Sequence, residues 1–512
     1  MSKDADKIFD FVIIGSGFGG MCCAYILADE GYSVALLEKN IQYGGCLQIF
    51  SRDKFILDTG LHYIGGFDPG QNLNTIFHYL GLADKMKFHR MDENGFDIIS
   101  FSDGRKFKHG MGYENFIQQL VKDFPEEEKA IHAFCKKIQE VCKQFPIYHL
   151  KDEQAENYLD VEVRGENAHD YLASITNNIA LRNVLAGNNM LYAGVKEKTP
   201  LFVLALIFNS YICGSYKIVT GGAQLIRQFS QRLREKGVKK MNRHKVVSAV
   251  YDGNKISALK TDTGETIYGK NFISAIHPSA TIDIFGQENF YPAFVKRINN
   301  LENTTSSFIV QLTFKPYSFP YLNHNIYHYF TDDVWETINY SGEEWPLGFY
   351  LTTPVPVKNK SFAESLTVMC YMQPEDVAPW VNTFNSTVHP GSRGDDYEKF
   401  KKQKEELVIK KLETLYPGIR NSILHVYSSS PLTFRDYTNS VNGSIYGILK
   451  NSNSPLSTVI NSRTKIPNLY LSGQNLIFHG VLGTSIGAIV TCFEFVNRKK
   501  LMEKINSFSQ LI

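Results

Sequence analysis

Three glycines near the N-terminus, Gly15, Gly17 and Gly20, have the spacing of a loop that holds the phosphates of a dinucleotide. They follow the apolar run 9–14, which predicts a buried parallel strand, and a helical stretch begins after them at Met21. The first glycine permits a tight turn, the second lets a pyrophosphate approach the backbone, and the third lets helix and strand pack closely. The N-terminus of the helix would then face the phosphate charge.

An acidic side chain stands at the end of the next predicted strand. Gly31 ends the first helix, residues 33–37 form the second strand, and Glu38 follows it. A carboxylate at that place can accept hydrogen bonds from a ribose diol and would repel a 2′-phosphate. This βαβ unit therefore favours the adenosine of FAD or NAD over that of NADP. The alternative is a glycine turn with an ordinary exposed glutamate.

Glycine pairs follow soon after, at 44–45 and 65–66. They suggest a second close approach of the backbone to a cofactor. Because the chain has no second GxGxxG, this arrangement favours a resident flavin over a nicotinamide site.

A second strand-glycine-helix unit lies close to the C-terminus. Residues 466–472 predict a strand that ends at Gly473 and Gln474, and residues 483–495 predict a helix. Reduced flavin carries negative charge near its N1–C2 carbonyl, so a helix N-terminus aimed there would raise its reduction potential. The alternative is a plain strand-to-helix junction without a ligand.

Length, charge and cysteine spacing exclude some classes of protein. The 512 residues fit two or three domains, and 43% hydrophobic residues allow a large core. The formal net charge of +2 lacks the basic excess of a nucleic-acid binder. Aromatic residues make up 13% and can line a long apolar cavity or simply fill a core. Eight scattered cysteines without CxxC pairs or zinc spacing indicate a reducing compartment and no metal site.

The remaining elements must position these residues. A hairpin is predicted around 252–254, a buried strand over 271–276, and a polar loop over 151–170. No clean apolar stretch reaches 18 residues, so a spanning helix is not expected. The apolar run 201–208 predicts a core helix, or a segment that lines a tunnel or dips into a bilayer surface.

Taken together, these segments resemble the superfamily of FAD-dependent amine oxidases and phytoene desaturases, in the branch of retinol saturase and carotenoid cis–trans isomerase. Cys46 stands where many desaturases carry Arg, and Gln474 where many flavoproteins carry Asp or Glu. Both departures favour the saturase-like branch. The motifs that carry the resemblance are FVIIGSGFGG at 11–20, LLEKN at 36–40, YGGC at 43–46, LDTGLHYIGG at 57–66, TGGAQLI at 220–226, FISAIHPSA at 272–280, PLTFRDY at 431–437, YG at 446–447, IPNLYLSGQN at 466–475 and GVLG at 480–483.

The resemblance implies an α/β fold with a Rossmann-like FAD-binding domain of the glutathione-reductase type. That domain would be discontinuous and built from residues 1–90, 217–290 and 425–512. Residues 91–216 and 291–424 would form an α+β substrate-binding cap.

The resemblance also implies the FAD contacts. Pyrophosphate would meet the GxGxxG glycines, the adenosine ribose would meet Glu38 with Lys39 beside it, and adenine would bond the main chain of Val247. The remaining contacts, with the ribityl chain, the isoalloxazine and the cofactor backbone, would come from Gly45, Gly473, Gln474, Leu482 and Gly483.

The implied reaction is hydride transfer at flavin N5 to or from a C=C or CH–CH bond of an apolar polyene or isoprenoid. In a saturase an acid must protonate the neighbouring carbon, and His62, Tyr63 and His479 are the candidates; a structural role is the alternative for each. A substrate of roughly 20 carbons would hardly leave a membrane unaided at about 0.8 kcal/mol per carbon. The sequence therefore predicts a cytoplasmic protein with peripheral membrane contact, helped by the basic run 498–500. Its electron donor or acceptor is unidentified.

Three other functions stay open. One is carotenoid isomerisation without net redox change, and another is amine oxidation. The third is a non-enzymatic role like that of GDP-dissociation inhibitors, which bind prenylated proteins with the same fold. The complete GxGxxG motif and Glu38 argue against the third.

Overall fold

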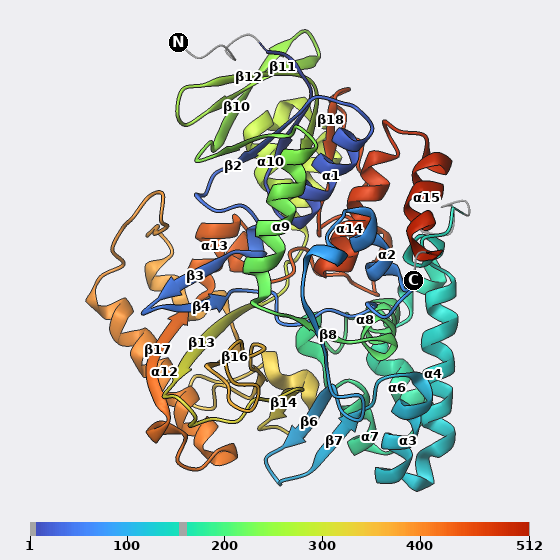
Figure 1. Ribbon diagram of the computed structural model, residues 1–512, viewed down its shortest axis with the longest axis vertical. Coiled ribbons are helices and arrows are strands. Elements are labelled where there is room, and N and C mark those ends of the chain that lie inside the picture. Colours follow the sequence, from blue (N-terminus) through green and yellow to red (C-terminus); the bar gives the residue numbers. More distant parts are fainter. Residues whose placement is uncertain (1–6, 153–160, 511–512) are drawn as a thin grey trace.

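The computed structural model describes residues 7–152 and 161–510. Two large β-sheets organise the chain, and helices from several segments cover them (Figure 1). The first sheet has the strand order β10-β11-β12-β1-β2-β9, with β18 on β12. The second has the order β17-β13-β16-β15-β14-β6-β7. The predicted α/β class is confirmed.

The first sheet unites three distant parts of the chain. Its strands are β1 (Phe9–Ile14), β2 (Val34–Glu38), β9 (Lys239–Asn242), β10 (Val246–Asp252), β11 (Lys255–Thr261), β12 (Thr266–Ser274) and β18 (Leu469–Leu471). β1 lies between β2 and β12 and runs parallel to both. β18 pairs in parallel with β12, so the C-terminal strand and the N-terminal strand end at one edge of the sheet.

The N-terminal βαβ unit forms as its residue pattern predicts. β1 and β2 are almost fully buried, as continuous apolar runs in a parallel sheet should be. α1 (Phe18–Asp29) begins directly after Gly17, three residues earlier than predicted, and Gly31 follows it with φ +90°. Gly20 therefore lies in the first turn of the helix, where it faces the sheet.

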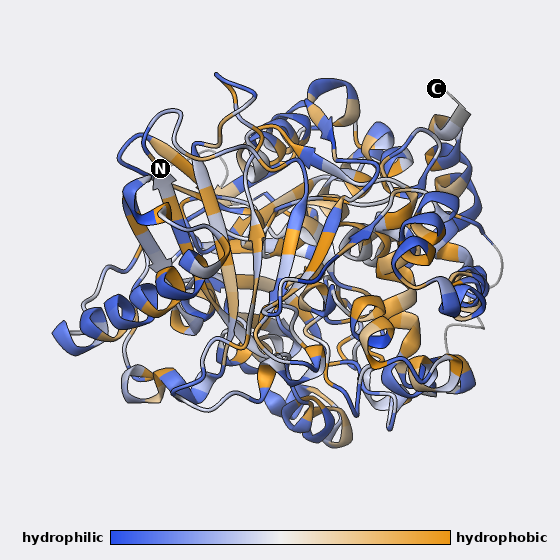
Figure 2. Cartoon of the chain, turned by 90° about the horizontal axis from the view of Figure 1, so that it is seen from below, coloured by the Kyte–Doolittle hydropathy of each residue, from blue (hydrophilic) through white to orange (hydrophobic). Residues whose placement is uncertain are grey.

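The second sheet is mostly antiparallel and lies beside the first. Its strands are β6 (Asp97–Phe101), β7 (Lys106–His109), β13 (Ser306–Phe314), β14 (Asn325–Tyr329), β15 (Gly348–Thr352), β16 (Ser365–Met372) and β17 (Ile423–Ser429). Figure 2 shows hydrophobic residues along the central strands and polar residues along outer helices such as α12 (Asp395–Leu415). One long polar helix thus shields an apolar sheet face from water.

Two short two-stranded sheets complete the strands: β3 (Ile49–Arg52) with β4 (Phe55–Asp58), and β5 (Phe88–Arg90) with β8 (Tyr216–Ile218). The other α-helices are α2 (Asn72–Tyr79), α3 (Tyr113–Asp123), α4 (Glu128–Lys143), α5 (Val161–Gly165), α6 (Ala168–Ile175), α7 (Ile179–Leu185), α8 (Leu201–Cys213), α9 (Gly221–Glu235), α10 (Pro278–Phe285), α11 (Pro292–Asn300), α13 (Pro431–Thr438), α14 (Gly480–Cys492) and α15 (Arg498–Asn506).

Two expectations from the sequence are wrong in detail. The polar segment 151–170 is not simply a loop, because α5 and the start of α6 lie in it; residues 153–160 of the prediction lie outside the described residues. Both helices pack against the apolar α8, which turns their few apolar side chains inward. The strand predicted over 466–472 is only three residues long, because only the residues of β18 are in register with β12. The predicted division into domains stays a prediction; its boundary at 425 lies within β17, which pairs with β13 of the second sheet.

Candidate active site

The glycine loop forms an open cradle between β1 and α1. A Cβ atom on Gly20 would lie 2.1 Å from the carbonyl oxygen of Gly15, so this position must be glycine for helix and strand to pack. A Cβ atom on Gly17 would meet nothing within 4 Å. The chain therefore leaves space above Gly17, which is where a pyrophosphate approaches in folds of this kind.

Glu38 is buried at the end of β2, with 5% of its surface exposed. One carboxylate oxygen accepts hydrogen bonds from the backbone N–H of Ser16 (3.1 Å) and from its hydroxyl (2.5 Å). The other accepts from the N–H of Asn40 at 2.8 Å. These bonds hold the carboxylate at the mouth of the glycine loop, as ribose binding requires.

Lys39 lies beside this carboxylate and points toward a distant segment. Its Nζ donates to the carbonyl oxygen of Asp436 in α13 at 2.8 Å. Burial lowers the pKa of Lys39 to about 8. Asp436 is fully buried and pairs with Arg393 and Arg435, so α13 is fixed over the end of β2 by charged groups that satisfy one another.

The paired glycines bring a third segment to the cradle. The N–H of Gly44 donates to the carbonyl oxygen of Ser16 at 2.9 Å. Gly45 has φ +56°, and a Cβ atom there would lie 3.0 Å from the Cα of Gly17. Only glycine allows this approach without displacing the loop.

The C-terminal segment closes the same region. Gly473 follows β18 with φ +103°, and a Cβ atom on Gly19 would lie 3.3 Å from the Gly473 Cα. α14 packs closely along α1 and begins a turn earlier than predicted, at Gly480. Consequently Leu482 and Gly483 lie in its first turn.

These segments enclose an elongated cavity of about 340 Å³. It runs from Glu38 and Lys39, past the glycine loop, to Gly473 and Gln474. Of the predicted contacts with the cofactor, those that line it are Gly15, Gly17, Glu38, Lys39, Gly45, Gly473 and Gln474. Gly20 serves packing instead, and Val247 is 47% exposed while its neighbour Val246 lines the cavity. The main-chain contact of Val247 stays a prediction.

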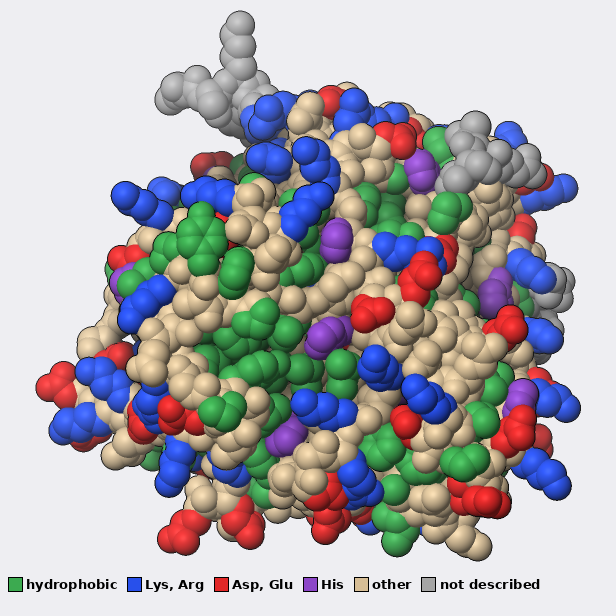
Figure 3. Space-filling model, turned by 60° about the horizontal axis from the view of Figure 1, so that its bottom comes forward, with side chains coloured by type: hydrophobic (Ala, Val, Ile, Leu, Met, Phe, Trp, Pro, Cys, Tyr) green, Lys and Arg blue, Asp and Glu red, His purple; other side chains and the backbone are tan. Residues whose placement is uncertain are grey.

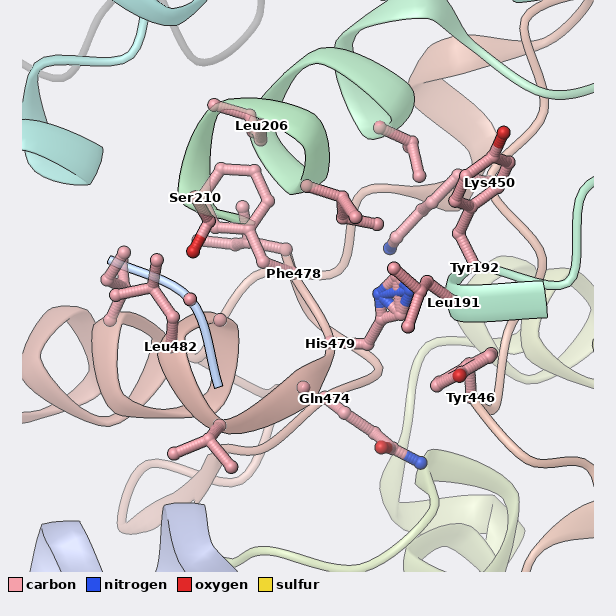
Figure 4. A pocket seen from close by; sticks show the side chains of 18 of the residues that line it. Leu191, Tyr192, Leu206, Ser210, Tyr446, Lys450, Gln474, Phe478, His479 and Leu482 are labelled. Atoms are coloured by element: carbon pink, nitrogen blue, oxygen red, sulfur yellow. The ribbon is translucent and has the colours of Figure 1, made fainter. Parts of the chain in front are cut away.

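A second cavity of about 130 Å³ lies between α8 and α14 and has mostly apolar walls. Figure 4 shows Leu206 and Ser210 of α8 on one side, and Leu482 and Phe478 opposite them. The predicted contacts Leu482 and Gly483 line this cavity and not the larger one. The apolar run 201–208 thus contributes one face to a core and the other to a cavity wall.

The two cavities border each other. The residues that line both are Tyr63, Leu191, Tyr211, Tyr446, Gln474, Gly480 and Val481. We call this set the junction. The larger cavity, which carries the glycine loop and Glu38, therefore borders a smaller apolar chamber, and three tyrosines lie along their shared boundary.

The three predicted acids occupy different places. Tyr63 lies at the junction, His62 lines the larger cavity, and His479 lines the apolar one. Burial lowers the pKa of each histidine to about 4, so both are neutral at pH 7. A neutral imidazole with so low a pKa is a poor proton donor near pH 7. The structure brings only Tyr63 to both cavities.

Sequence reasoning missed several buried ionisable groups near the junction. Asp97 accepts a hydrogen bond from the Tyr63 hydroxyl at 2.9 Å, and Lys217 is 1% exposed in β8. Lys450 lines the apolar cavity, with its Nζ donating to three carbonyl oxygens. None belongs to a motif, and Asp97 follows a loop of ordinary polar composition, so no local signal marked them.

Similarity to known proteins agrees with this geometry. Residues 13–80 match a family of NAD(P)-binding Rossmann-like domains. All-trans-retinol 13,14-reductase of Danio rerio is 24% identical, with 96% of this chain and 87% of the relative aligned. The Homo sapiens protein of that name is also 24% identical, over 98% and 88%. The predicted resemblance is confirmed.

Other similar proteins carry the names of an isomerase and of amine oxidases. Prolycopene isomerase 2 of an Oncidium hybrid cultivar is 23% identical, over 84% of this chain and 73% of its own. Among solved structures, putrescine oxidase with bound putrescine superposes with a TM-score of 0.64 at 12% identity, covering 94% and 97% of the two chains. Cyclohexylamine oxidase of Brevibacterium oxydans gives 0.61 at 14%, covering 98% and 99%. At such identities the structures establish the shared fold alone.

Proposed function

We propose that this protein is an FAD-dependent oxidoreductase that acts on a C=C or CH–CH bond of an apolar polyene. The junction carries the proposal: the cavity that holds the glycine loop and Glu38 borders an apolar chamber at shared tyrosine residues. A hydride acceptor or donor held in the cradle would face a carbon chain held in the chamber.

The chain's own groups fit FAD. The space above Gly17 would admit the pyrophosphate, and the buried Glu38 would bind the ribose. Gly45, Gly473 and Gln474 would meet the remainder of the cofactor. FAD, when bound, supplies two-electron chemistry at its ring system, which no side chain can supply.

The protein's contribution is then to position and to exclude water. α8 and α14 provide hydrocarbon walls from Phe202, Leu206 and Ile486. Burying a polyene against such walls is favourable by about 25 cal/mol per Å² of apolar surface. A dry chamber also protects a reactive carbon from competing reactions.

The names of the relatives support reduction of a double bond as the direction. The relatives at 24% identity are retinol 13,14-reductases, and others, at 20–23%, are prolycopene isomerases. Cis–trans isomerisation is the second candidate, since the same two cavities would serve it. It needs no net proton, whereas reduction does.

Membrane contact belongs to this proposal because of the substrate. Among the described residues, no helix is long and apolar enough to cross a bilayer. Of the basic run, Arg498 pairs with Asp152, whereas the Nζ of Lys499 lies 4.0 Å from Glu503. Figure 3 shows charges of both signs interspersed on one face, with hydrophobic side chains between them. Flotation with anionic liposomes tests the contact, and no bound fraction would contradict it.

The decisive experiment starts from the FAD-loaded protein. Its absorbance spectrum should show bound flavin after gel filtration. Anaerobic reduction and incubation with a panel of retinoids and carotenoids should then yield a product two hydrogens heavier by mass spectrometry. A product of unchanged mass and altered double-bond geometry would identify an isomerase instead. A protein that takes up no FAD would contradict both.

A further inference from the structure

A group of buried hydroxyl and carboxyl side chains meets the cavities at Tyr63, which lines both, and at Tyr327, which lines the larger one; Asp97, behind them, lines neither. Tyr63 donates from its hydroxyl to Asp97 Oδ2 at 2.9 Å, and its oxygen lies 2.8 Å from the hydroxyl oxygen of Tyr327. Asp97 Oδ1 accepts from the side-chain amide of Asn325 at 2.9 Å. Asp97 and Tyr327 are 0% exposed and Tyr63 is 6% exposed.

Separate elements fix this geometry. Asp97 begins β6, and Asn325 lies directly opposite it on the parallel strand β14, which also carries Tyr327. The Tyr63 ring stacks on Tyr211 of α8 with centroids 4.3 Å apart. Because strand pairing and ring stacking hold both ends, the hydroxyl of Tyr63 cannot leave Asp97 without a change in packing.

The surroundings favour the neutral form of Asp97. Within the described parts of the chain, no Lys, Arg or His lies in ion-pair contact with it. The cation that lowers the pKa of Asp97 is Lys217, whose Nζ instead donates to the carbonyl oxygens of Leu322 (2.9 Å) and Thr353 (3.0 Å). Burial raises the pKa of the Asp97 carboxyl to about 7, against the opposing effect of its hydrogen bonds.

Other titratable groups face Asp97 from each neighbouring element. His109 lies opposite on β7, where burial lowers its pKa to about 4, and it is neutral at pH 7. Tyr211 of α8, Tyr327 of β14 and Tyr350 of β15 each have a pKa raised by burial, so they stay protonated. Asp97 and Lys217 are therefore the groups here that change charge near neutral pH.

We propose that Asp97 holds the proton that Tyr63 delivers to the substrate carbon at the junction. The inference rests on the proposed reduction of a double bond. Tyr63 is then the catalytic acid, and Asp97 is a positioning and proton-holding residue behind it.

The direction of the hydrogen bonds depends on the charge of Asp97. When Asp97 is ionised, the single proton of Tyr63 is committed to the carboxylate, and Tyr327 must donate to Tyr63. When Asp97 is protonated, it donates to Tyr63, whose own proton is released toward the cavity. Burial holds the pKa of Tyr63 well above its usual value, so a tyrosinate would not persist and the Asp97 proton must replace the one delivered.

The step balances in atoms and electrons. Reduced FAD, when bound, would supply the hydride for a new C–H bond at one carbon of the double bond, whose π bond breaks. The electron pair left on the neighbouring carbon takes the proton of Tyr63. Asp97 passes its proton to Tyr63 and regains one from solvent, so each cycle consumes one hydride and one proton.

The test uses the FAD-loaded full chain and three variants. In the wild type, the rate of polyene reduction should be constant at low pH and should fall about tenfold per pH unit above about 7. Asp97→Asn should lower the rate and abolish this pH dependence, because an amide cannot titrate. Tyr63→Phe should lower the rate by about 10²–10⁴-fold.

Tyr371→Phe is the matched control. Tyr371 is also buried, and its hydroxyl donates to the carbonyl oxygen of Asn189, but it lines neither cavity. Its rate should stay within about twofold of the wild type, as expected where an acid–base role is absent. If Tyr63→Phe does not fold, Tyr327→Phe replaces it and should lower the rate while the pH profile persists.

Infrared spectroscopy gives a readout that does not depend on turnover. Burial also raises the pKa of Asp58 to about 7, so the readout is the difference spectrum between wild type and Asp97→Asn, which should contain a protonated-carboxyl band of Asp97 that persists to about pH 7. Absence of that band, or an Asp97→Asn variant with the wild-type pH profile, would overturn the inference. If the wild type reduces no polyene while the band titrates as expected, the proposed function fails and the protonation of Asp97 stands.

Discussion

At the scale of single residues, two glycines of the GxGxxG motif are needed for different reasons: Gly20 for packing within the protein, and Gly17 for space beside the loop. Gly20 is required by packing, since any Cβ atom there collides with the Gly15 carbonyl. Gly17 is required by nothing within the protein, because its φ is −58° and its side-chain position is open. The two glycines should therefore respond differently to substitution.

Gly17→Val should leave the protein folded and remove FAD binding. The added side chain meets no protein atom but fills the space above the loop, so the melting temperature without FAD should change little. Bound flavin after gel filtration is the measurement. Gly342→Val, also with no atom within 4 Å but outside both cavities, is the control and should bind flavin normally. Gly20→Val should instead fail to fold.

The lowered pKa of Lys217 predicts that the free energy of unfolding depends on pH. Burial lowers the pKa of Lys217 to about 7 from a model-compound value of 10.5. Between these values the unfolded chain binds more protons than the folded one, so the free energy of unfolding should rise with pH from about 7 to about 10.5. Each unit of the pKa difference corresponds to about 1.4 kcal/mol.

Denaturant unfolding at several pH values measures this rise. Lys217→Met should lower stability, because the carbonyl oxygens of Leu322, His324 and Thr353 lose a donor, but it should also reduce the slope with pH. Lys450, whose pKa burial also lowers to about 7, should keep part of the slope. Lys399→Met, at an exposed site, should leave the slope unchanged, and an unchanged slope in Lys217→Met would contradict the prediction.

At the scale of elements, α8 shows how one apolar helix serves two surroundings. Leu204, Ala205 and Phe208 are buried, and the helix packs on α4. Phe202, Leu206 and Ser210 line the apolar cavity. The uniform hydrophobicity of the run could predict burial on all sides, but it could not show that one face borders a chamber.

Leu206→Trp should therefore block substrate without affecting the cofactor. The larger side chain would occupy the apolar cavity, and polyene affinity should fall by tenfold or more, equivalent to about 1.4 kcal/mol. Retinoid fluorescence titration measures affinity, and the flavin spectrum should not change. Leu206→Ala, which enlarges the chamber, is the control and should retain binding. Loss of FAD in Leu206→Trp would contradict the assignment of FAD to the larger cavity and of the substrate to the apolar one.

At the scale of the whole molecule, the first and last segments share one sheet and one cavity. β18 reaches β1 through β12, and α14 packs on α1. The second sheet supplies the far wall through Ile309, Tyr327 and Met369. The larger cavity therefore exists only when both ends of the chain and the second sheet have assembled.

Hydrogen exchange should reveal this closure. Adding FAD should slow amide exchange in residues 15–20 and also in residues 473–484, because both border the same cavity. Exchange in α12, which borders neither cavity, should not change. Protection confined to the N-terminal segment would contradict the shared site.

The amino-acid sequence by itself determined the local units of this protein. Strand, glycine loop and helix at 9–29 follow from apolar runs and from glycines whose backbone demands are local. The motif also indicated Glu38, because its place at the end of β2 is a matter of spacing.

Only the tertiary structure decided which of the remaining residues meet. Tyr63, Asp97 and Tyr327 come from three segments and touch because β6 pairs with β14 and a loop stacks on α8. Such contacts depend on the pairing of strands that are far apart in the sequence. The same pairing buries Asp97, and this burial raises its pKa. Neither leaves a periodic or spaced signal in the chain, which is why the candidate acid could be named from the sequence but not its partner.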